Sequence, residues 1–189
     1  MAEKPSWWAR QCARYLRRRG WVCDSETMPV KRGIILGVPH TSIKDFLVAY
    51  CFYASKGKKI HVMIKKELFF FPLGAILRSM GCIPVDRSNA AALVKSLIDE
   101  MNKVDEFHLA IAPEGTRKPV KRWKAGFHLI AKETGVPVWA GYFDWGTKHV
   151  GIGEQFEITD DAKADLKRLQ EHYESLHLTG CHPEGYITH

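Results

Sequence analysis

The chain has 189 residues, 46% of them hydrophobic, which suits one domain with a buried core and excludes a disordered chain. The formal net charge of +7 favours an anionic partner: a phospholipid surface, a phosphorylated metabolite, a coenzyme or a nucleic acid. No aromatic and basic module of a nucleic-acid-binding type is present, so we expect no nucleic-acid partner.

Three features of the sequence bear on the cellular compartment of the protein. No apolar run reaches the roughly 18 residues of a membrane-spanning helix, since the longest candidate, 68–77, is short and contains Pro72. The N-terminus lacks the apolar core of a secretory signal. The five cysteines are odd in number, widely spaced and without a CxxC pair, so we expect reduced thiols in a cytosolic protein.

The first element in chain order is a helix expected over residues 5–20, which Pro5 suits as a beginning and Gly20 as an end. One face of this helix carries Trp8, Cys12, Tyr15 and Leu16. The other side is basic and carries Arg10, Arg14, Arg17 and Arg18. Aromatic rings beside arginines are typical of a helix that lies in a membrane interface. The alternative is a helix packed on the domain with a solvated basic face, so we set residues 1–22 apart as a membrane-interface candidate.

From residue 31 onward, short apolar runs alternate with helical stretches. The expected helices are 43–55, 74–80, 89–103, 125–134 and 160–173, the last capped by Thr159. The expected strands are 34–38, 60–64, 82–85, 107–112 and 136–143, with two short strands within 149–158. This alternation predicts an α/β fold in residues 31–189: one domain with a mixed, mostly parallel sheet flanked by helices.

Polar residues follow the strand at 34–38. His40 lies just beyond this strand, and Asp45 lies five residues further, in the first turn of the next helix. A histidine titrates near neutral pH and can act as a general base, and a carboxylate on its other ring nitrogen fixes the tautomer. The alternative for His40 is a turn residue whose hydrogen bonds go to the backbone.

A second polar group follows the strand at 107–112, with the order Glu114-Gly115-Thr116-Arg117. Arg117 offers a planar fork that matches a phosphate, and Glu114 can accept a hydrogen bond from a substrate hydroxyl. Arg87 follows a third strand, at 82–85, and can join Arg117 around an anion. The alternatives are a surface loop with an internal Glu–Arg pair, and a solvated Arg87.

Four motifs in a fixed order resemble those of the glycerolipid acyltransferase family, whose best-known members are the 1-acylglycerol-3-phosphate acyltransferases. The motifs are HxxxxD at 40–45, Gly-x-Ile-Pro-x-Asp-Arg at 81–87, Pro-Glu-Gly-Thr-Arg at 113–117 and Gly-Val-Pro-Val at 135–138. The resemblance covers more than half of the chain, and the separation of HxxxxD from Glu-Gly-Thr-Arg is specific.

The resemblance implies a role for each matching residue. His40 would deprotonate the acceptor hydroxyl, and Asp45 would orient His40. The residues implied in acceptor binding are Arg87, Glu114, Gly115, Thr116 and Arg117. The implied reaction moves an acyl group from acyl-CoA or acyl carrier protein to a lysophospholipid, most directly 1-acylglycerol-3-phosphate, giving phosphatidic acid. No cofactor and no metal are expected, and the protein would work as a peripheral protein on the cytoplasmic membrane face.

One departure from the family pattern leaves the acceptor open. Family members usually place a further proline after the fourth motif, where this chain has Trp139 and Ala140, so the pocket near this strand can suit a different acyl chain or a different acceptor. The alternative acceptors are another lysophospholipid and an acylated amino-acid lipid. Two different functions also fit the residues: a thioesterase, in which His40 activates water, and a catalytically silent lipid-binding protein. The apolar segment 68–73 either inserts into lipid, lines an acyl-chain groove or packs in the core.

Overall fold

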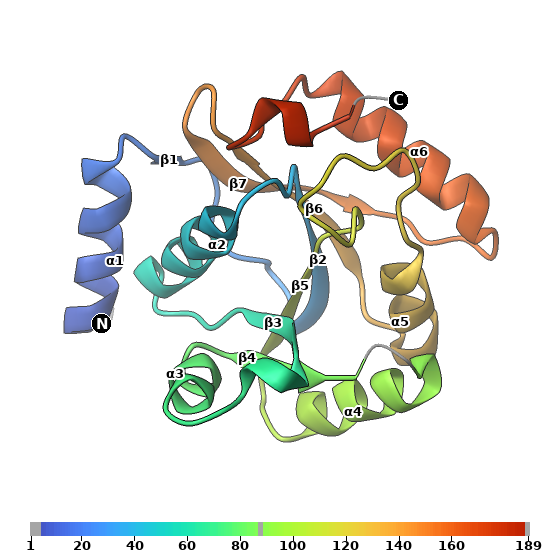
Figure 1. The fold of residues 1–189 in the computed structure, drawn as a ribbon, viewed down its shortest axis with the longest axis horizontal. Helices are drawn as coiled ribbons and strands as arrows, with labels where there is room; N and C mark the ends of the chain where they lie inside the picture. The colour runs from blue at the N-terminus through green and yellow to red at the C-terminus, as the bar shows by residue number, and fades with distance from the viewer. Residues whose placement is uncertain (1–4, 87–88, 188–189) are drawn as a thin grey trace.

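The computed structural model describes residues 5–86 and 89–187, and its centre is a single sheet between layers of helices (Figure 1). The strands run in the order β1-β7-β6-β2-β5-β3-β4. Their bounds are β1 Val22–Cys23, β2 Arg32–Val38, β3 His61–Lys65, β4 Cys82–Val85, β5 Phe107–Ile111, β6 Val138–Asp144 and β7 His149–Phe156. The predicted fold class, a mixed and mostly parallel sheet flanked by helices, is confirmed.

The central strand β2 is parallel to both of its neighbours. It pairs with β5 in a register that sets Leu36 opposite Ile111, and with β6 in a register that sets Val38 opposite Tyr142. Strands β3 and β4 continue the parallel order beyond β5, whereas β7 is antiparallel to β6. The carboxyl ends of β2, β5 and β6 therefore meet at one edge of the sheet, where α/β folds commonly place their binding sites.

Helices cover both faces of the sheet, with α1 and α2 on one side and α4, α5 and α6 on the other (Figure 1). Their bounds are α1 Trp7–Arg18, α2 Ile43–Ser55, α3 Leu73–Ser79, α4 Ala90–Asn102, α5 Gly126–Thr134 and α6 Ala162–Ser175. Two short 3-10 turns add η1 Lys66–Leu68 and η2 Pro183–Gly185. The five cysteines are free thiols.

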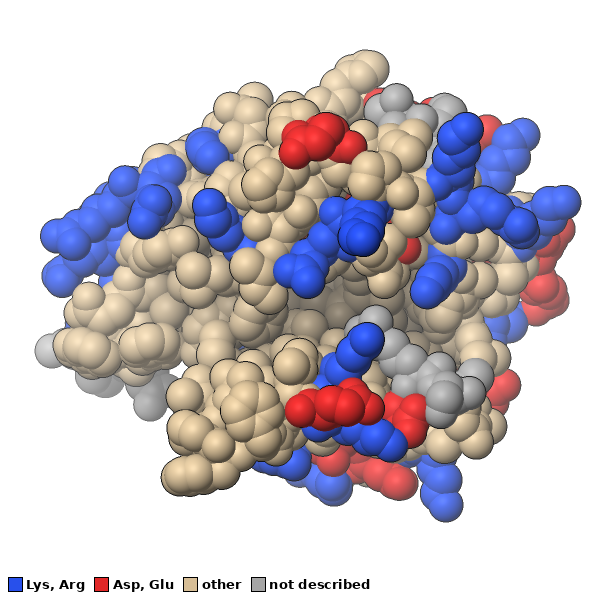
Figure 2. Space-filling view, in the orientation of Figure 1, with Lys and Arg blue, Asp and Glu red and all other residues tan. Residues whose placement is uncertain are grey.

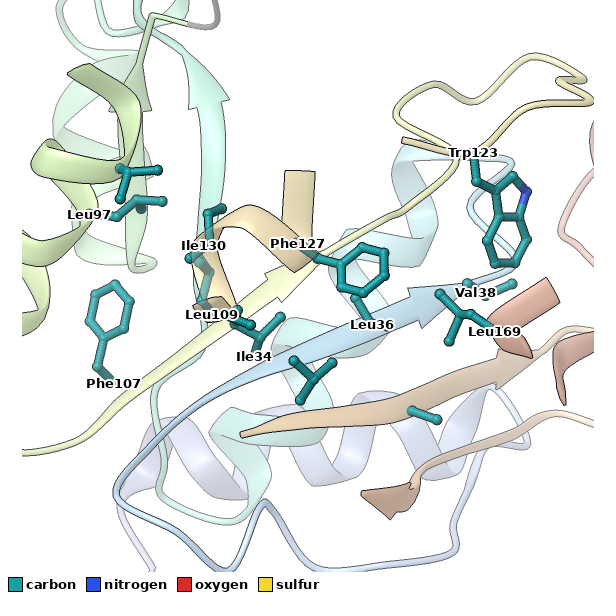
Figure 3. Packing of buried hydrophobic residues seen from close by; sticks show 14 of the residues in the cluster. Ile34, Leu36, Val38, Leu97, Phe107, Leu109, Trp123, Phe127, Ile130 and Leu169 are labelled. Carbon is teal, nitrogen blue, oxygen red and sulfur yellow. The ribbon is translucent and has the colours of Figure 1, made fainter. Parts of the chain in front are cut away.

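Successive side chains of β2 point to opposite faces of the sheet, so this strand contributes to the hydrophobic core on both faces. Leu36 and Val38 lie with Phe127 and Leu169 on the side of α5 and α6 (Figure 3). Ile35 points to the opposite face and belongs to the cluster that includes residues of α1 and α2. Because a strand buried on both faces tolerates little displacement, β2 holds the loop that begins at its carboxyl end in a fixed place.

Three local predictions are wrong. The short strand β1 is missing from the predicted set, and residues 149–156 form one strand, β7, in place of two. The residue that caps α6 is Asp161, whose carboxylate accepts the backbone N–H groups of Lys163 and Ala164. Thr159 is occupied elsewhere, because its backbone N–H and its hydroxyl both donate to Asp165.

Helix α1 packs against α2 and exposes its aromatic end. Its buried residues are Ala9, Cys12 and Leu16. Trp8, predicted on the same apolar face, is 50% exposed and donates its ring N–H to the Tyr50 hydroxyl at 2.9 Å. Trp7 is 63% exposed. The helix thus contacts the domain along one stripe while both tryptophans remain accessible to another surface.

The segment 68–73 lies mostly on the surface. Phe70 and Phe71 are 58% and 90% exposed, so packing in the core is excluded for these two rings. Leu68 is exposed as well. Across residues 5–86 and 89–187, no helix combines the length and the apolar character that crossing a bilayer requires.

Candidate active site

The candidate site lies at the carboxyl edge of the parallel strands. His40 follows β2, Glu114 follows β5 and Trp145 follows β6. Since β5 and β6 flank β2 on either side, the loops that carry these residues are neighbours in space although they are far apart in sequence. The sheet order alone therefore brings the HxxxxD loop and the Glu-Gly-Thr-Arg loop together.

The first turn of α2 fixes the carboxylate of Asp45. Ser42 is the N-cap residue, and Ser42 and Asp45 form a capping box. Oδ2 of Asp45 accepts the backbone N–H groups of Thr41 and Ser42 at 2.8 and 2.7 Å. Asp45 is fully buried, and these donors together with the positive end of the helix stabilise a negative charge there.

Asp45 also faces the imidazole of His40. Nδ1 of His40 lies 3.2 Å from Oδ2 of Asp45, and the His40 side chain is 26% exposed. A carboxylate at this position holds the ring proton on Nδ1 and leaves Nε2 as the basic nitrogen. The predicted His40–Asp45 pair is thus present with the geometry of a general base and its orienting carboxylate.

Glu114 lies beneath His40 and supports its backbone. Both carboxyl oxygens of Glu114 lie within hydrogen-bonding distance of the His40 backbone N–H, at 3.0 and 2.9 Å. Burial raises the pKa of Glu114 to about 8, with the His40 N–H acting to lower it and the Asp45 charge acting to raise it. Glu114 therefore holds the loop that carries His40, whereas the sequence alone suggests contact with a substrate hydroxyl.

Gly115 turns the chain outward after the buried Glu114. Its φ of 68° lies in the left-handed region, which glycine enters without steric cost. Arg117, two residues further, lies at the surface beside the pocket described next. Within the described residues Glu114 makes no ion pair with Arg117, so the internal Glu–Arg pair considered from the sequence is excluded.

Both motif loops line one pocket of about 360 Å³. Its lining residues are Thr41, Ser42, Ile43, Thr116, Arg117, Lys118 and His182. Arg117 and Lys118 bring positive charge to this pocket, which suits an anionic group. Figure 2 shows a hollow in the centre of the face turned to the viewer, with Lys and Arg side chains above and below it and acidic side chains below it.

The predicted anion-binding residue Arg87 lies outside the described residues. The residue before it, Asp86, accepts a hydrogen bond from Lys66 at 2.6 Å. Strand β4, which leads to this segment, is separated from β2 by β5 and β3. The role of Arg87 in acceptor binding stays a prediction.

Trp145 is a site residue that the motifs do not include. Its ring N–H donates to Oδ1 of Asp45 at 2.8 Å, on the carboxylate oxygen that does not face His40. Trp21 packs edge-on against the Trp145 ring, and the Lys148 ammonium lies 4.4 Å from its centroid. One sequence feature could have pointed to Trp145. It directly follows strand β6, just as His40 follows the neighbouring strand β2.

The arrangement can move a proton. The imidazole of His40 can accept one at Nε2 while Asp45 stabilises the resulting positive charge. Three donors, from Thr41, Ser42 and Trp145, hold the Asp45 carboxylate in place. Beside this pair, Arg117 and Lys118 border a pocket that suits an anion. Fold and site together define an α/β protein with a buried carboxylate paired to a histidine, next to a pocket that carries positive charge.

Comparison with known proteins identifies the family. A family model described as Acyltransferase matches residues 21–143. The chain is also 37% identical over 100 residues to a 1-acyl-sn-glycerol-3-phosphate acyltransferase of Streptococcus pneumoniae, a match that covers 52% of this chain and 36% of that relative. The chain therefore belongs to the Acyltransferase family, and the match spans about a third of the length of this curated relative.

Proposed function

We propose that this chain transfers a fatty acyl group from a thioester to the free hydroxyl of a lysophospholipid. The preferred acceptor is 1-acylglycerol-3-phosphate, and the product is phosphatidic acid. The observation that carries the proposal is the His40–Asp45 pair, 3.2 Å apart, beside a pocket bordered by Arg117 and Lys118. Family membership and the name of the Streptococcus pneumoniae relative support the same reaction.

The chemistry needs one base and no covalent enzyme intermediate. Nε2 of His40 takes the proton of the acceptor hydroxyl as its oxygen attacks the thioester carbonyl carbon. The carbon–oxygen bond forms, the carbon–sulfur bond breaks, and the departing thiolate receives the proton from His40. Asp45 stabilises the imidazolium between these two proton transfers.

The pocket favours an acceptor that carries a phosphate. Arg117 can donate two parallel hydrogen bonds to phosphate oxygens, and Lys118 adds a second positive charge. Thr41 and Ser42 line the same pocket and directly follow His40 in the chain, so the proposal puts the phosphate against the HxxxxD loop. Binding energy from the phosphate then positions the hydroxyl for attack.

The acyl donor in this proposal is acyl-CoA or acyl carrier protein, and it acts as a substrate. A thioester is already activated, so the residues of the chain need to supply positioning and proton transfer. The donor carries phosphate groups, and the net charge of +7 attracts it electrostatically.

We propose a peripheral position on the cytoplasmic face of a membrane, where lysolipid acceptors reside. Trp7 and Trp8 are exposed on α1, whose last turn carries Arg17 and Arg18. Exposed tryptophans and arginines on one helix favour the interfacial layer of an anionic bilayer. Phe71, which is 90% exposed and lies between η1 and α3, adds an apolar contact.

The test is an acyl-transfer assay with palmitoyl-CoA and 1-acylglycerol-3-phosphate on anionic vesicles. Released thiol and lipid product are followed together, the latter by mass spectrometry. Thiol release that depends on the acceptor, with phosphatidic acid as product, supports the proposal. Thiol release that is equal without an acceptor would identify a thioesterase, and product from another lysolipid alone would overturn the named acceptor.

A further inference from the structure

A segment near the end of the described chain crosses the site and is not part of any motif. We call residues 179–186 the strap. Its first residue, Thr179, donates its backbone N–H to Oδ1 of Asp144 at 2.9 Å, and its carbonyl oxygen accepts the backbone N–H of Trp145 at 2.9 Å. The strap is therefore fastened to the carboxyl end of β6, directly beside the residue that holds Asp45.

The strap contacts both motif loops. The backbone N–H of His182 donates to Oγ1 of Thr41 at 3.1 Å. A Cβ atom at Gly180 would lie 2.8 Å from the Thr41 side chain, and one at Gly185 would lie 3.2 Å from Thr41 and 3.4 Å from the carbonyl oxygen of Arg117. The two glycines thus let the strap lie close to the HxxxxD loop. A larger residue at Gly180 would collide with the Thr41 side chain.

The side chain of His182 is available to a ligand. It lines the pocket together with Arg117 and Lys118, and it is 56% exposed. Its nearest acidic group, Oε1 of Glu184, is 3.8 Å from Nδ1 and also exposed, so this contact is weak. An imidazole always carries at least one N–H, which can donate to a phosphate or carboxylate oxygen.

We propose that the strap forms the third wall of the acceptor pocket and that His182 binds the anionic headgroup of the acceptor together with Arg117. This inference rests on the proposed function and adds a headgroup-binding residue outside the family motifs. His182 touches the acceptor and not the acyl donor, so it sets acceptor specificity. Thr41 anchors the strap, which couples the pocket wall to the loop of His40.

The experiment uses the full chain and two readouts. Binding of glycerol 3-phosphate, the soluble form of the headgroup, is measured by calorimetry, and KM values are measured separately for 1-acylglycerol-3-phosphate and palmitoyl-CoA. The variant is His182→Ala, and the matched control is His177→Asn, a histidine outside the pocket whose left-handed backbone asparagine tolerates. Gly180→Ala tests the strap contact independently.

We expect His182→Ala to weaken glycerol 3-phosphate binding and to raise the acceptor KM about tenfold. This is the change expected when one hydrogen bond to a charged group is lost. The donor KM and the thermal midpoint should not change, and His177→Asn should match the wild type. Gly180→Ala should weaken headgroup binding through the displaced strap. Equal affinities in wild type and His182→Ala, or a wild type that does not bind glycerol 3-phosphate, would overturn the inference.

The two proposals fail differently. If the wild type binds glycerol 3-phosphate through His182 but transfers no acyl group, the proposed reaction fails and the assignment of His182 stands. If transfer to 1-acylglycerol-3-phosphate proceeds with the same acceptor KM in His182→Ala, the reaction stands and the assignment of His182 fails.

Discussion

Replacing Glu114 with glutamine should remove a large pH dependence of stability. In the folded chain the pKa of Glu114 is raised from 4.5 to about 8, mainly because the carboxyl group is buried. Between these two values the folded protein holds a proton that the unfolded chain has released, so the free energy of unfolding falls as pH rises. The loss begins near pH 4.5 and is complete near pH 8.

The magnitude follows from the displacement of the pKa. Each unit corresponds to about 1.4 kcal/mol, so Glu114 should lower the free energy of unfolding by on the order of 5 kcal/mol between the unfolded and the folded pKa. Glutamine is isosteric, does not titrate, and its amide oxygen can still accept the His40 N–H. The free energy of unfolding of Glu114→Gln should therefore equal that of the wild type at the acidic end of this range and exceed it at the alkaline end.

The assay is urea unfolding at about pH 5, 6.5 and 8, values that span the two pKa values of Glu114, followed by tryptophan fluorescence. Burial lowers the pKa values of His61 and His108, so these groups add stability as pH rises, but they titrate alike in all variants and cancel in the comparison. Glu184→Gln, at an exposed glutamate, is the matched control and should follow the wild type. A stability difference between Glu114→Gln and the wild type that stays constant across this pH range would show that Glu114 is not the titrating group.

Three further variants test the site and the proposed membrane contact of α1. Trp145→Phe keeps an aromatic ring but removes the donor to Asp45, so kcat should fall about tenfold with an unchanged acceptor KM, and an unchanged kcat would exclude a positioning role. Arg117→Ala should raise the KM for 1-acylglycerol-3-phosphate by about tenfold or more and leave that for palmitoyl-CoA unaltered; equal effects on both substrates would argue against phosphate binding. The double variant Trp7→Ala, Trp8→Ala should sediment less with anionic vesicles, and undiminished sedimentation would remove α1 from the membrane contact.

The sequence is sufficient to predict the fold because its elements are locally encoded. Helix α2 has the predicted bounds, since a capping residue and an apolar period mark Ile43–Ser55. Strands β2 and β4 are short apolar runs between turn residues, and the prediction locates both. The cap of α6 is misassigned because two neighbouring residues, Thr159 and Asp161, offer similar capping groups, and the tertiary contact of Thr159 with Asp165 decides between them.

The site is only partly encoded in local sequence. The His40–Asp45 pair can be predicted because the capping box and the helix start fix its geometry within one short segment. Trp145 and His182 reach the same place from β6 and the strap through contacts 100 and 141 residues apart in the chain, and no local pattern marks them. The inward position of Glu114 likewise depends on the pairing of β5 with β2, which periodicity does not reveal.

The role of His40 as the general base is tested most directly by the rate of acyl transfer in His40→Ala at saturating palmitoyl-CoA and 1-acylglycerol-3-phosphate. We predict that kcat falls about a hundredfold or more, the typical contribution of a general base. Far-UV circular dichroism and the binding of glycerol 3-phosphate should be retained, because His40 is partly exposed and does not line the pocket. A folded His40→Ala variant whose kcat stays close to that of the wild type would contradict the assignment of His40 as the base.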